Sequence, residues 1–148
     1  MTDAWKQSPN AALYLPALAA AETAHGIPAD LLARIAYQES HWRPEIVSGE
    51  LKSPAGCAGL MQLNPKFFAN AGVSWQADIE TAAKYLADLH HEFYGDWQLA
   101  VMAYNWGPGH VAQYVRSHAD IDDLPAETRN YVTDVFTDVP MDGSVVYA

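Results

Sequence analysis

Apolar residues recur at helical spacing along most of the chain, which predicts helices joined by short loops. The first such segment covers residues 10–25, and Gly26 after it suits the left-handed conformation in which many helices end. Pro28 and Asp30 then open a second helix, because proline favours the first turn and aspartate the cap. That second helix carries the stretch LLARIAYQESHW, residues 31–42.

Three further helices are predicted in the second half of the chain. A stripe of apolar residues over 78–94 ends at Gly95. The run LAVMAY, residues 99–104, is apolar on every side and predicts a central helix that is buried all round. Pro125 starts the last helix, whose side chains pair four residues apart. The pairs are Tyr131 with Val135 and Val132 with Phe136.

The segment from 41 to 57 breaks the helical pattern. Its sequence, HWRPEIVSGELKSPAGC, is rich in Pro, Gly and Ser, and it predicts an irregular loop with a short β-hairpin around Ser48 and Gly49. The end of the chain, residues 140–148, is predicted to be a loose tail. These elements together predict an all-α fold with at most a small β-hairpin.

Composition narrows the class of protein. The chain has 148 residues, half of them apolar, with no repeat or linker, so we expect a single domain over 1–148. The lone Cys57 excludes an internal disulfide. We find no pattern typical of a signal peptide or a membrane span. With 18 acids against 8 bases, the net charge of −10 argues against nucleic acid as a partner.

Two adjacent histidines in the segment HHE, residues 90–92, do not predict a metal site. Neighbouring residues of a helix point about 100° apart, so His90 and His91 do not face one ion together. We expect these side chains to be solvated. The sequence therefore predicts no metal and no cofactor.

An acid ends the apolar stripe of the second helix. Leu32 and Ile35 share one face of that helix, and Glu39 is the next position on the same face. The negative end of the helix dipole and burial beside apolar groups both raise the pKa of a carboxyl placed there, which suits a general acid. A glutamate at this position also fits a frayed helix end that points to solvent, and spacing alone does not decide between the two.

Four segments carry a resemblance to a known family. They are YQESHWRP at 37–44, SPAGCAGLMQLNP at 53–65, AYNWGPGHV at 103–111 and LPAETRNYV at 124–132. Their order over residues 30–135 resembles the motifs of the soluble lytic transglycosylase (SLT) domain, which is related to goose-type lysozymes. The departures affect local packing only. Cys57 stands where the family is expected to have Ala, and Asp78 where it often has Asn.

This resemblance implies a lysozyme-like single domain with a glycan-binding cleft. Glu39 matches the family's catalytic acid. Aromatic, amide and hydroxyl side chains are the types that bind uncharged sugars, and Trp42 is another aromatic of this kind. The residues that match the substrate-binding segments are Ser40, Met61, Gln62, Tyr104, Asn105 and Tyr131.

Spacing leaves a packing role open for several of these residues. Tyr104 lies in the apolar run and fits the core as well as it fits the cleft. Asn105 fits a helix cap ahead of Gly107. Met61 and Trp106 fit packing equally well.

The resemblance implies a peptidoglycan lytic transglycosylase. In that reaction Glu39 protonates the glycosidic oxygen of the β-1,4 bond between N-acetylmuramic acid (MurNAc) and N-acetylglucosamine (GlcNAc). The resulting carboxylate takes the proton from the C6 hydroxyl, whose oxygen attacks C1 and forms a 1,6-anhydroMurNAc end without consuming water. The expected partner is the peptidoglycan glycan strand, bound by a monomer without membrane insertion.

Two alternatives stay open. A hydrolytic muramidase on the same fold needs a second carboxylate to position water, and Glu45 and Glu50 are the loop acids in reach. A non-catalytic glycan-binding or structural phage tail protein keeps the fold without the activity, although the retention of Glu39 and Gln62 argues against it. The setting suits a phage endolysin or virion enzyme delivered by phage or released by a holin, and nearly as well a periplasmic enzyme with its leader removed.

Overall fold

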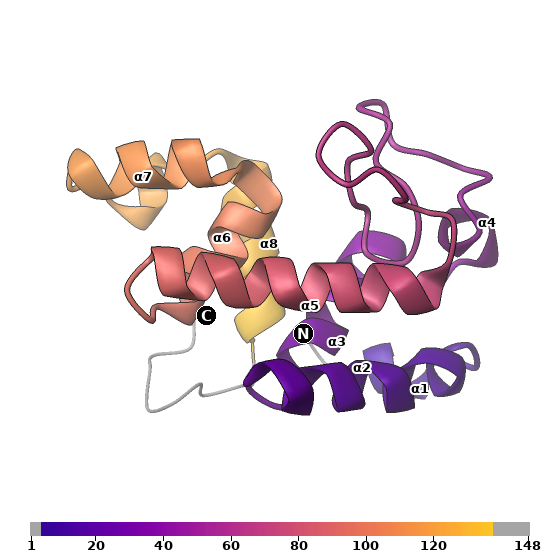
Figure 1. Cartoon of the computed structure of the whole chain (residues 1–148). Helices are drawn as coiled ribbons and strands as arrows, with labels where there is room; N and C mark the ends of the chain where they lie inside the picture. Colours follow the sequence, from indigo (N-terminus) through magenta and orange to yellow (C-terminus); the bar gives the residue numbers. More distant parts are fainter. Residues whose placement is uncertain (1–3, 138–148) are drawn as a thin grey trace. The chain divides into compact units, whose positions relative to one another are not determined.

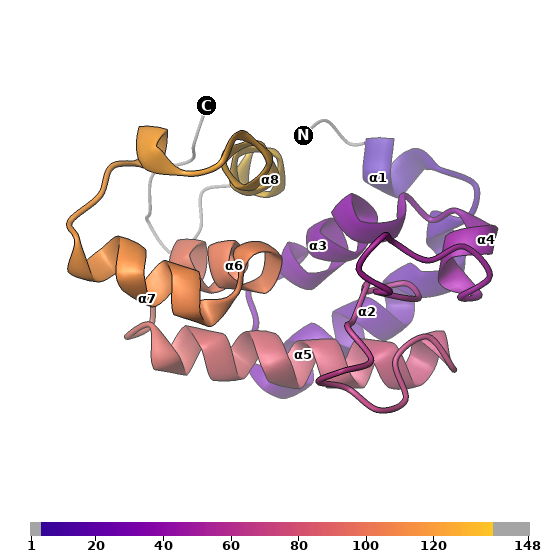
Figure 2. The same cartoon turned by 90° about the horizontal axis from the view of Figure 1, so that it is seen from above.

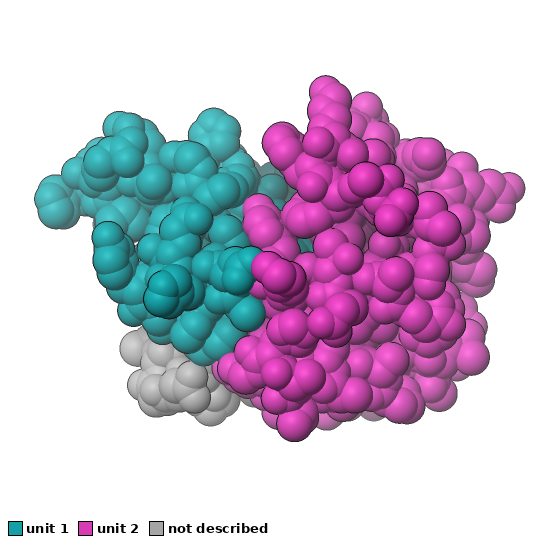
Figure 3. All heavy atoms as spheres, in the orientation of Figure 1, with its two compact units in different colours: residues 1, 86–148 teal, residues 2–85 magenta. Residues whose placement is uncertain are grey.

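The computed structural model describes residues 4–137, and within that range it is helical. The only β-type pairing among these residues is an isolated antiparallel bridge between Ala58 and Leu63. Internal contacts divide the chain into two compact units (Figure 3). The described residues up to Tyr85 form unit 2, and those from Leu86 onward form unit 1.

Unit 2 consists of four helices and the first part of a fifth (Figure 1). Their bounds are α1 Ala4–Gln7, α2 Ala11–His25, α3 Leu31–Ser40, α4 Pro44–Val47 and α5 Trp75–Glu92. Helices α1 and α3 both pack against α2 (Figure 2). The two helices predicted first are confirmed in α2 and α3. Gly26 follows α2 with φ of 68°, the left-handed conformation expected of it.

The buried face of α3 is apolar along most of its length. Leu32, Ile35 and Ala36 are 0% exposed, as the stripe in the sequence predicted. Burying a leucine or isoleucine side chain contributes about 1.5–3 kcal/mol, so this stripe fixes the rotation of α3 about its own axis. Glu39 therefore sits in the last turn of a helix whose orientation within unit 2 is well determined.

Unit 1 contains the end of α5 and four further elements. These are α6 Trp97–Trp106, α7 Pro108–Arg116, a short 3₁₀ helix η1 Ile121–Asp123, and α8 Ala126–Phe136. Helix α6 packs against both α7 and α8 (Figure 1). The middle of α6, from Ala100 to Ala103, is buried as predicted, whereas Leu99 and Tyr104 on either side of it are partly exposed. Helix α8 begins directly after Pro125, also as predicted.

Several local features differ from the prediction. The β-hairpin around Ser48 and Gly49 is wrong, because Pro44 starts the short helix α4 and these two residues form the turn after it. Helix α5 begins at Trp75 and not at 78, since the Ser74 hydroxyl accepts a hydrogen bond from the N–H of Ala77 (3.3 Å) and caps the first turn.

Helix α7 was not predicted. It is separated from α6 by Gly107, whose φ of 98° breaks the helix before Pro108 restarts it. The predicted loose tail, 140–148, lies outside the described residues.

Candidate active site

The end of α3 is tied down immediately after Glu39. Glu39 is partly buried in the last turn of the helix, and Ser40 beside it is fully buried. The Ser40 hydroxyl donates to the carbonyl of Ala36 (2.9 Å) and accepts from the N–H of Trp42 (3.3 Å). The first bond lies within the last turn of α3, and the second ties that turn to the residues that follow it. Ser40 thus holds the turn next to the acid.

The two residues after Ser40 adopt a conformation that side-chain-bearing residues rarely take. His41 has φ of 52° and Trp42 has φ of 58°, so the chain turns sharply at two successive left-handed residues. Such strain persists only where the surroundings over-determine it. The Trp42 indole N–H donates to the carbonyl of Trp5 (2.7 Å), and the Asn10 side-chain amide donates to the carbonyl of Trp42 (3.2 Å).

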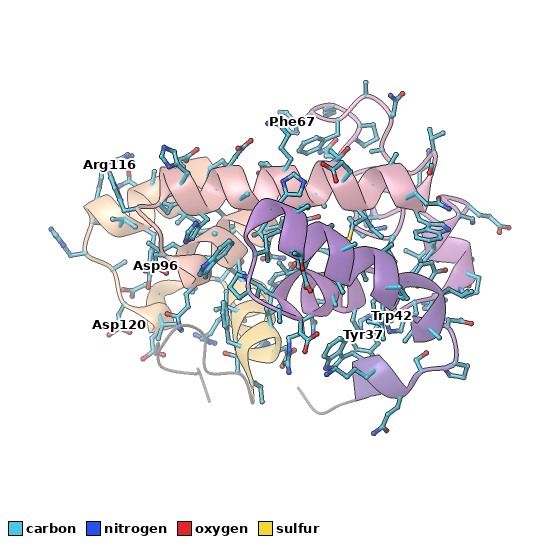
Figure 4. All side chains as sticks on the ribbon, turned by 60° about the horizontal axis from the view of Figure 1, so that its bottom comes forward. Tyr37, Trp42, Phe67, Asp96, Arg116 and Asp120 are labelled. Carbon is cyan, nitrogen blue, oxygen red and sulfur yellow. The ribbon has the colours of Figure 1, made fainter. Side chains whose placement is uncertain are left out.

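An aromatic cluster encloses the Trp42 ring. Its centroid lies 5.6 Å from that of Tyr14 in a stacked arrangement. It lies 5.7 Å from that of Tyr37 in a tilted arrangement, and Figure 4 labels Tyr37 and Trp42 near each other. Trp75 meets Tyr14 edge-on at 5.1 Å. Because Trp42 is 0% exposed, the idea that it presents its face to a sugar is wrong. Its burial instead anchors the turn that follows Glu39.

The other end of α3 is capped by a residue of α2. Asp30, predicted to cap this helix, has φ of 72° and makes no side-chain cap, and its carboxylate contacts Lys6 (3.3 Å). The Glu22 carboxylate takes its place, accepting from the N–H of Asp30 (3.0 Å) and from that of Ala33 (3.2 Å). Burial raises the pKa of Glu22, and these hydrogen bonds lower it in part.

Glu22 is a residue whose role the sequence pattern missed. It lies on the buried stripe of α2 with Tyr14 and Leu18, and it is only 4% exposed. An acid on an apolar stripe is the same signal that singled out Glu39. The pattern identifies such a carboxyl as unusual, but it does not say which backbone groups the carboxyl will meet.

Replacing Glu22 with alanine is expected to lower the free energy of unfolding by about 2 kcal/mol, because the N–H groups of Asp30 and Ala33 lose their acceptor. Urea unfolding followed by circular dichroism measures this change. The exposed Glu92→Ala serves as the matched control and should change stability by less than about 0.5 kcal/mol. Equal stability of the two variants would show that Glu22 does not cap α3.

The GLMQ segment, residues 59–62, forms a tight loop in unit 2. Ala58 and Leu63 exchange backbone hydrogen bonds of 3.0 and 3.2 Å, which close the loop between them. Gln62 has φ of 50°, and its side-chain amide donates to the carbonyl of Gly59 (2.9 Å). Met61 is 0% exposed and packs inward, whereas Gln62 is partly exposed. Of these two predicted site residues, Gln62 is the one with surface to offer a ligand.

The remaining predicted site residues belong to unit 1. Tyr104 and Asn105 are partly exposed in the last turn of α6. Gly107 donates its N–H to Ala103 (2.8 Å) at the end of that helix, so Asn105 is not the capping residue. Tyr131 on α8 is 8% exposed. The structure thus describes Glu39, Ser40, Met61 and Gln62 in one unit and these three residues in the other.

The histidines of the HHE segment differ in their surroundings. The His90 ring stacks on Trp97 with centroids 3.7 Å apart, while His91 is exposed. Over residues 4–137, no group of three or more His, Cys, Asp or Glu side chains is arranged to hold a metal ion. None of the helices in that range is long and apolar enough to cross a membrane.

Comparison with known proteins identifies the family. The model of the transglycosylase SLT domain matches residues 16–124. The chain is 39% identical over 101 residues to membrane-bound lytic murein transglycosylase F 2 of Alkalilimnicola ehrlichii. This aligned region covers 62% of this chain and 21% of that protein. The chain is also 31% identical over 131 residues to the soluble lytic murein transglycosylase of Escherichia coli, and that aligned region covers 74% of this chain and 20% of that protein.

Solved structures agree with this match. The 70 kDa soluble lytic transglycosylase of Escherichia coli superimposes with a TM-score of 0.64 at 29% identity, over 83% of this chain and 23% of that one. An inactive glutamate-to-glutamine mutant of lytic transglycosylase Slt from Pseudomonas aeruginosa gives a TM-score of 0.63 at 28% identity, over 82% and 22%. The chain thus spans about a fifth of the length of these relatives. The helical fold and the match over 16–124 show that this chain belongs to the transglycosylase SLT domain family.

Proposed function

We propose that this protein is a peptidoglycan lytic transglycosylase that cleaves the β-1,4 bond between MurNAc and GlcNAc and leaves a 1,6-anhydroMurNAc end. The observation that carries the proposal is the placement of Glu39 in an SLT-family chain. It is a partly buried acid in the last turn of α3, followed directly by a strained and anchored turn. The named relatives are lytic murein transglycosylases, which supports the assignment.

In this proposal Glu39 acts first as an acid and then as a base. Its carboxyl, partly buried in the last turn of α3, first donates a proton to the glycosidic oxygen. After donation, the carboxylate removes the proton of the MurNAc C6 hydroxyl as that oxygen attacks C1. The bond to the leaving sugar breaks and the C6–O–C1 bond forms, so water is not a reactant.

The state of the loop acids supports this reaction over hydrolysis. Hydrolysis needs a second carboxylate that activates water. Glu45 is held by Arg43 (2.7 Å), and hydrogen bonds from its own backbone N–H and from that guanidinium lower its pKa. A carboxylate with a lowered pKa is a weak base. Glu50 is exposed on the turn after α4.

We assign glycan contacts to the predicted site residues that have exposed surface. The side-chain amide N–H of Gln62 donates to the carbonyl of Gly59. We therefore assign its side-chain carbonyl oxygen to a hydrogen bond with a sugar amide or hydroxyl. Tyr104 and Asn105 are partly exposed and supply an aromatic face and an amide. The other predicted site residues are buried, so we assign them a supporting role in place of a glycan contact. The supporting residues are Ser40, Met61 and Tyr131.

The names of the relatives bear on the biological setting. They are bacterial proteins described as soluble or membrane-bound and as acting on murein. We therefore place the activity of this chain at the bacterial cell wall, in the periplasm, with the protein acting as a monomer. The bacterial origin of these relatives supports an enzyme of the bacterium's own envelope over one delivered by phage.

Two loop-acid variants test the choice of reaction. Glu45→Gln and Glu50→Gln are each expected to change the rate of cell-wall solubilisation by less than about tenfold, because Glu39 works without a second carboxylate. Product ends should be 1,6-anhydro sugars that borohydride does not reduce. A loss of a hundredfold or more in either variant, about the size expected for a base that activates water, would identify a hydrolase instead.

A further inference from the structure

A buried carboxylate holds the loop between α4 and α5. Asp78, in the first turn of α5, is 2% exposed. The N–H of Gly72 donates to both of its oxygens, at 3.2 and 3.1 Å. Burial raises the pKa of this carboxyl, and the hydrogen bond from Gly72 lowers it in part. A buried acid requires such a partner, and here the partner is the backbone of the loop that α5 follows.

Two glycines bring that loop into direct contact with the GLMQ segment. A Cβ atom on Gly59 would lie 2.4 Å from an Asp78 oxygen and 3.0 Å from the Cα of Gly72. A Cβ atom on Gly72 would lie 2.7 Å from that of Ala58. Gly59 also has φ of 84° and Gly72 has φ of 82°, both in the left-handed region. We call Gly59, Gly72 and Asp78 the glycine junction, a contact with no room for a side chain on either glycine.

The glycine junction contacts Gln62 directly, through Gly59. The carbonyl of Gly59 accepts from the Gln62 backbone N–H (3.2 Å) and from its side-chain amide (2.9 Å). Both bonds fix the left-handed conformation of Gln62 and the direction of its side chain. The path from Asp78 to Gln62 therefore runs through a single residue, Gly59, with close contacts on both sides.

We propose that Asp78 is a positioning residue for Gln62, and that it acts on substrate binding through the glycine junction. This inference rests on the proposed function, in which Gln62 contacts the glycan. Asp78 itself is too buried to touch a substrate. When the Asp78 carboxylate is removed, the N–H of Gly72 loses its acceptor and Gly72 is free to move. Gly59 and the side-chain amide of Gln62 then move with it. Glu39 lies on a different element, α3, which Glu22 caps at its start and Ser40 and Trp42 hold at its end.

The test compares kinetic constants on soluble peptidoglycan strands. Asp78→Ala is expected to raise KM about tenfold with kcat within about twofold of wild type, because the partly buried N–H of Gly72 loses the carboxylate that accepts from it while Glu39 stays in place. Asp78→Asn keeps one oxygen for Gly72 and should restore KM to within about threefold of wild type. The exposed Asp134→Ala, on α8, is the matched control and should leave both constants unchanged.

A double-mutant comparison isolates the route through Gln62. If Asp78 acts through Gln62, adding Asp78→Ala to Gln62→Ala should raise KM by less than about twofold beyond Gln62→Ala alone. Should Asp78→Ala fail to melt cooperatively, Asp78→Ser, which has a hydroxyl in place of the carboxylate, is used in the same comparison.

The outcomes separate this inference from the proposed function. A wild-type protein that does not cleave the strands overturns the proposed function. Cleavage by wild type, with a KM for Asp78→Ala equal to that of wild type, overturns the inference alone. Additive effects of the Gln62 and Asp78 changes would also overturn it, because they would show that Asp78 acts by another route.

Discussion

Replacing Glu39 with glutamine is expected to lower the rate of glycan cleavage by at least about a thousandfold while leaving the fold intact. General acid and general base catalysis each contribute about 10² to 10⁴ in rate, and the substitution removes both from one residue. The amide has the same shape as the carboxyl, so it fits the same partly buried position in α3. Release of soluble fragments from purified cell walls measures the loss.

Glu50→Gln is the matched control for this experiment, because it makes the same chemical change on an exposed turn. Thermal melting of Glu39→Gln should stay within a few degrees of wild type. Substantial lysis by a folded Glu39→Gln protein would remove Glu39 from the proposed mechanism.

Replacing Trp42 with alanine is expected to have the largest effect on stability, about 3–5 kcal/mol. The ring is fully buried, and it stacks on Tyr14. The carbonyl of Trp5 also loses the indole N–H that donates to it. Urea unfolding should be followed by circular dichroism, because the substitution also removes a fluorescent side chain.

Trp42→Phe separates ring packing from the hydrogen bond. It retains most of the aromatic contact with Tyr14 but leaves the Trp5 carbonyl without its donor, so a smaller loss of about 1–3 kcal/mol is expected. The activity of the folded fraction should fall in the same order, since this turn holds Glu39. A Trp42→Ala protein as stable as wild type would show that the strained turn is held by other contacts.

Features set by neighbouring residues were predictable from the sequence. Gly26 marks the end of α2 because a left-handed residue is needed there, and glycine adopts it without strain. Helix α5 instead ends at Glu92, before the predicted stop at Gly95, and Tyr94 is left-handed as well. The apolar stripe of α3 was readable because it repeats with the helical period. Its buried face and its acid at the end both follow from spacing.

Features set by distant residues were not predictable in this way. The cap of α3 comes from Glu22 on α2, because Asp30 adopts a left-handed conformation that turns its carboxylate toward Lys6. Trp42 looked like a sugar-stacking residue from its type alone. Only the packing of Tyr14 and the carbonyl of Trp5 shows that it is enclosed.

The candidate site illustrates the same division. The order of the motifs predicted which residues belong to the site. It did not distinguish side chains with exposed surface from buried ones. Gln62 is partly exposed while Met61, next to it, is fully buried. Asp78 was noted only as a small departure from the family. Its contacts with Gly59 and Gly72 depend on a loop path that local sequence does not specify.

Digestion of purified peptidoglycan in heavy-oxygen water tests the central claim most directly. If Glu39 deprotonates the C6 hydroxyl and that oxygen attacks C1, the new MurNAc ends carry no label and are lighter by one water than reducing ends. Mass spectrometry of the released fragments reads both properties at once. Unlabelled 1,6-anhydro ends are the predicted result, and heavy oxygen at the new muramoyl C1 would contradict the account by identifying water as the nucleophile.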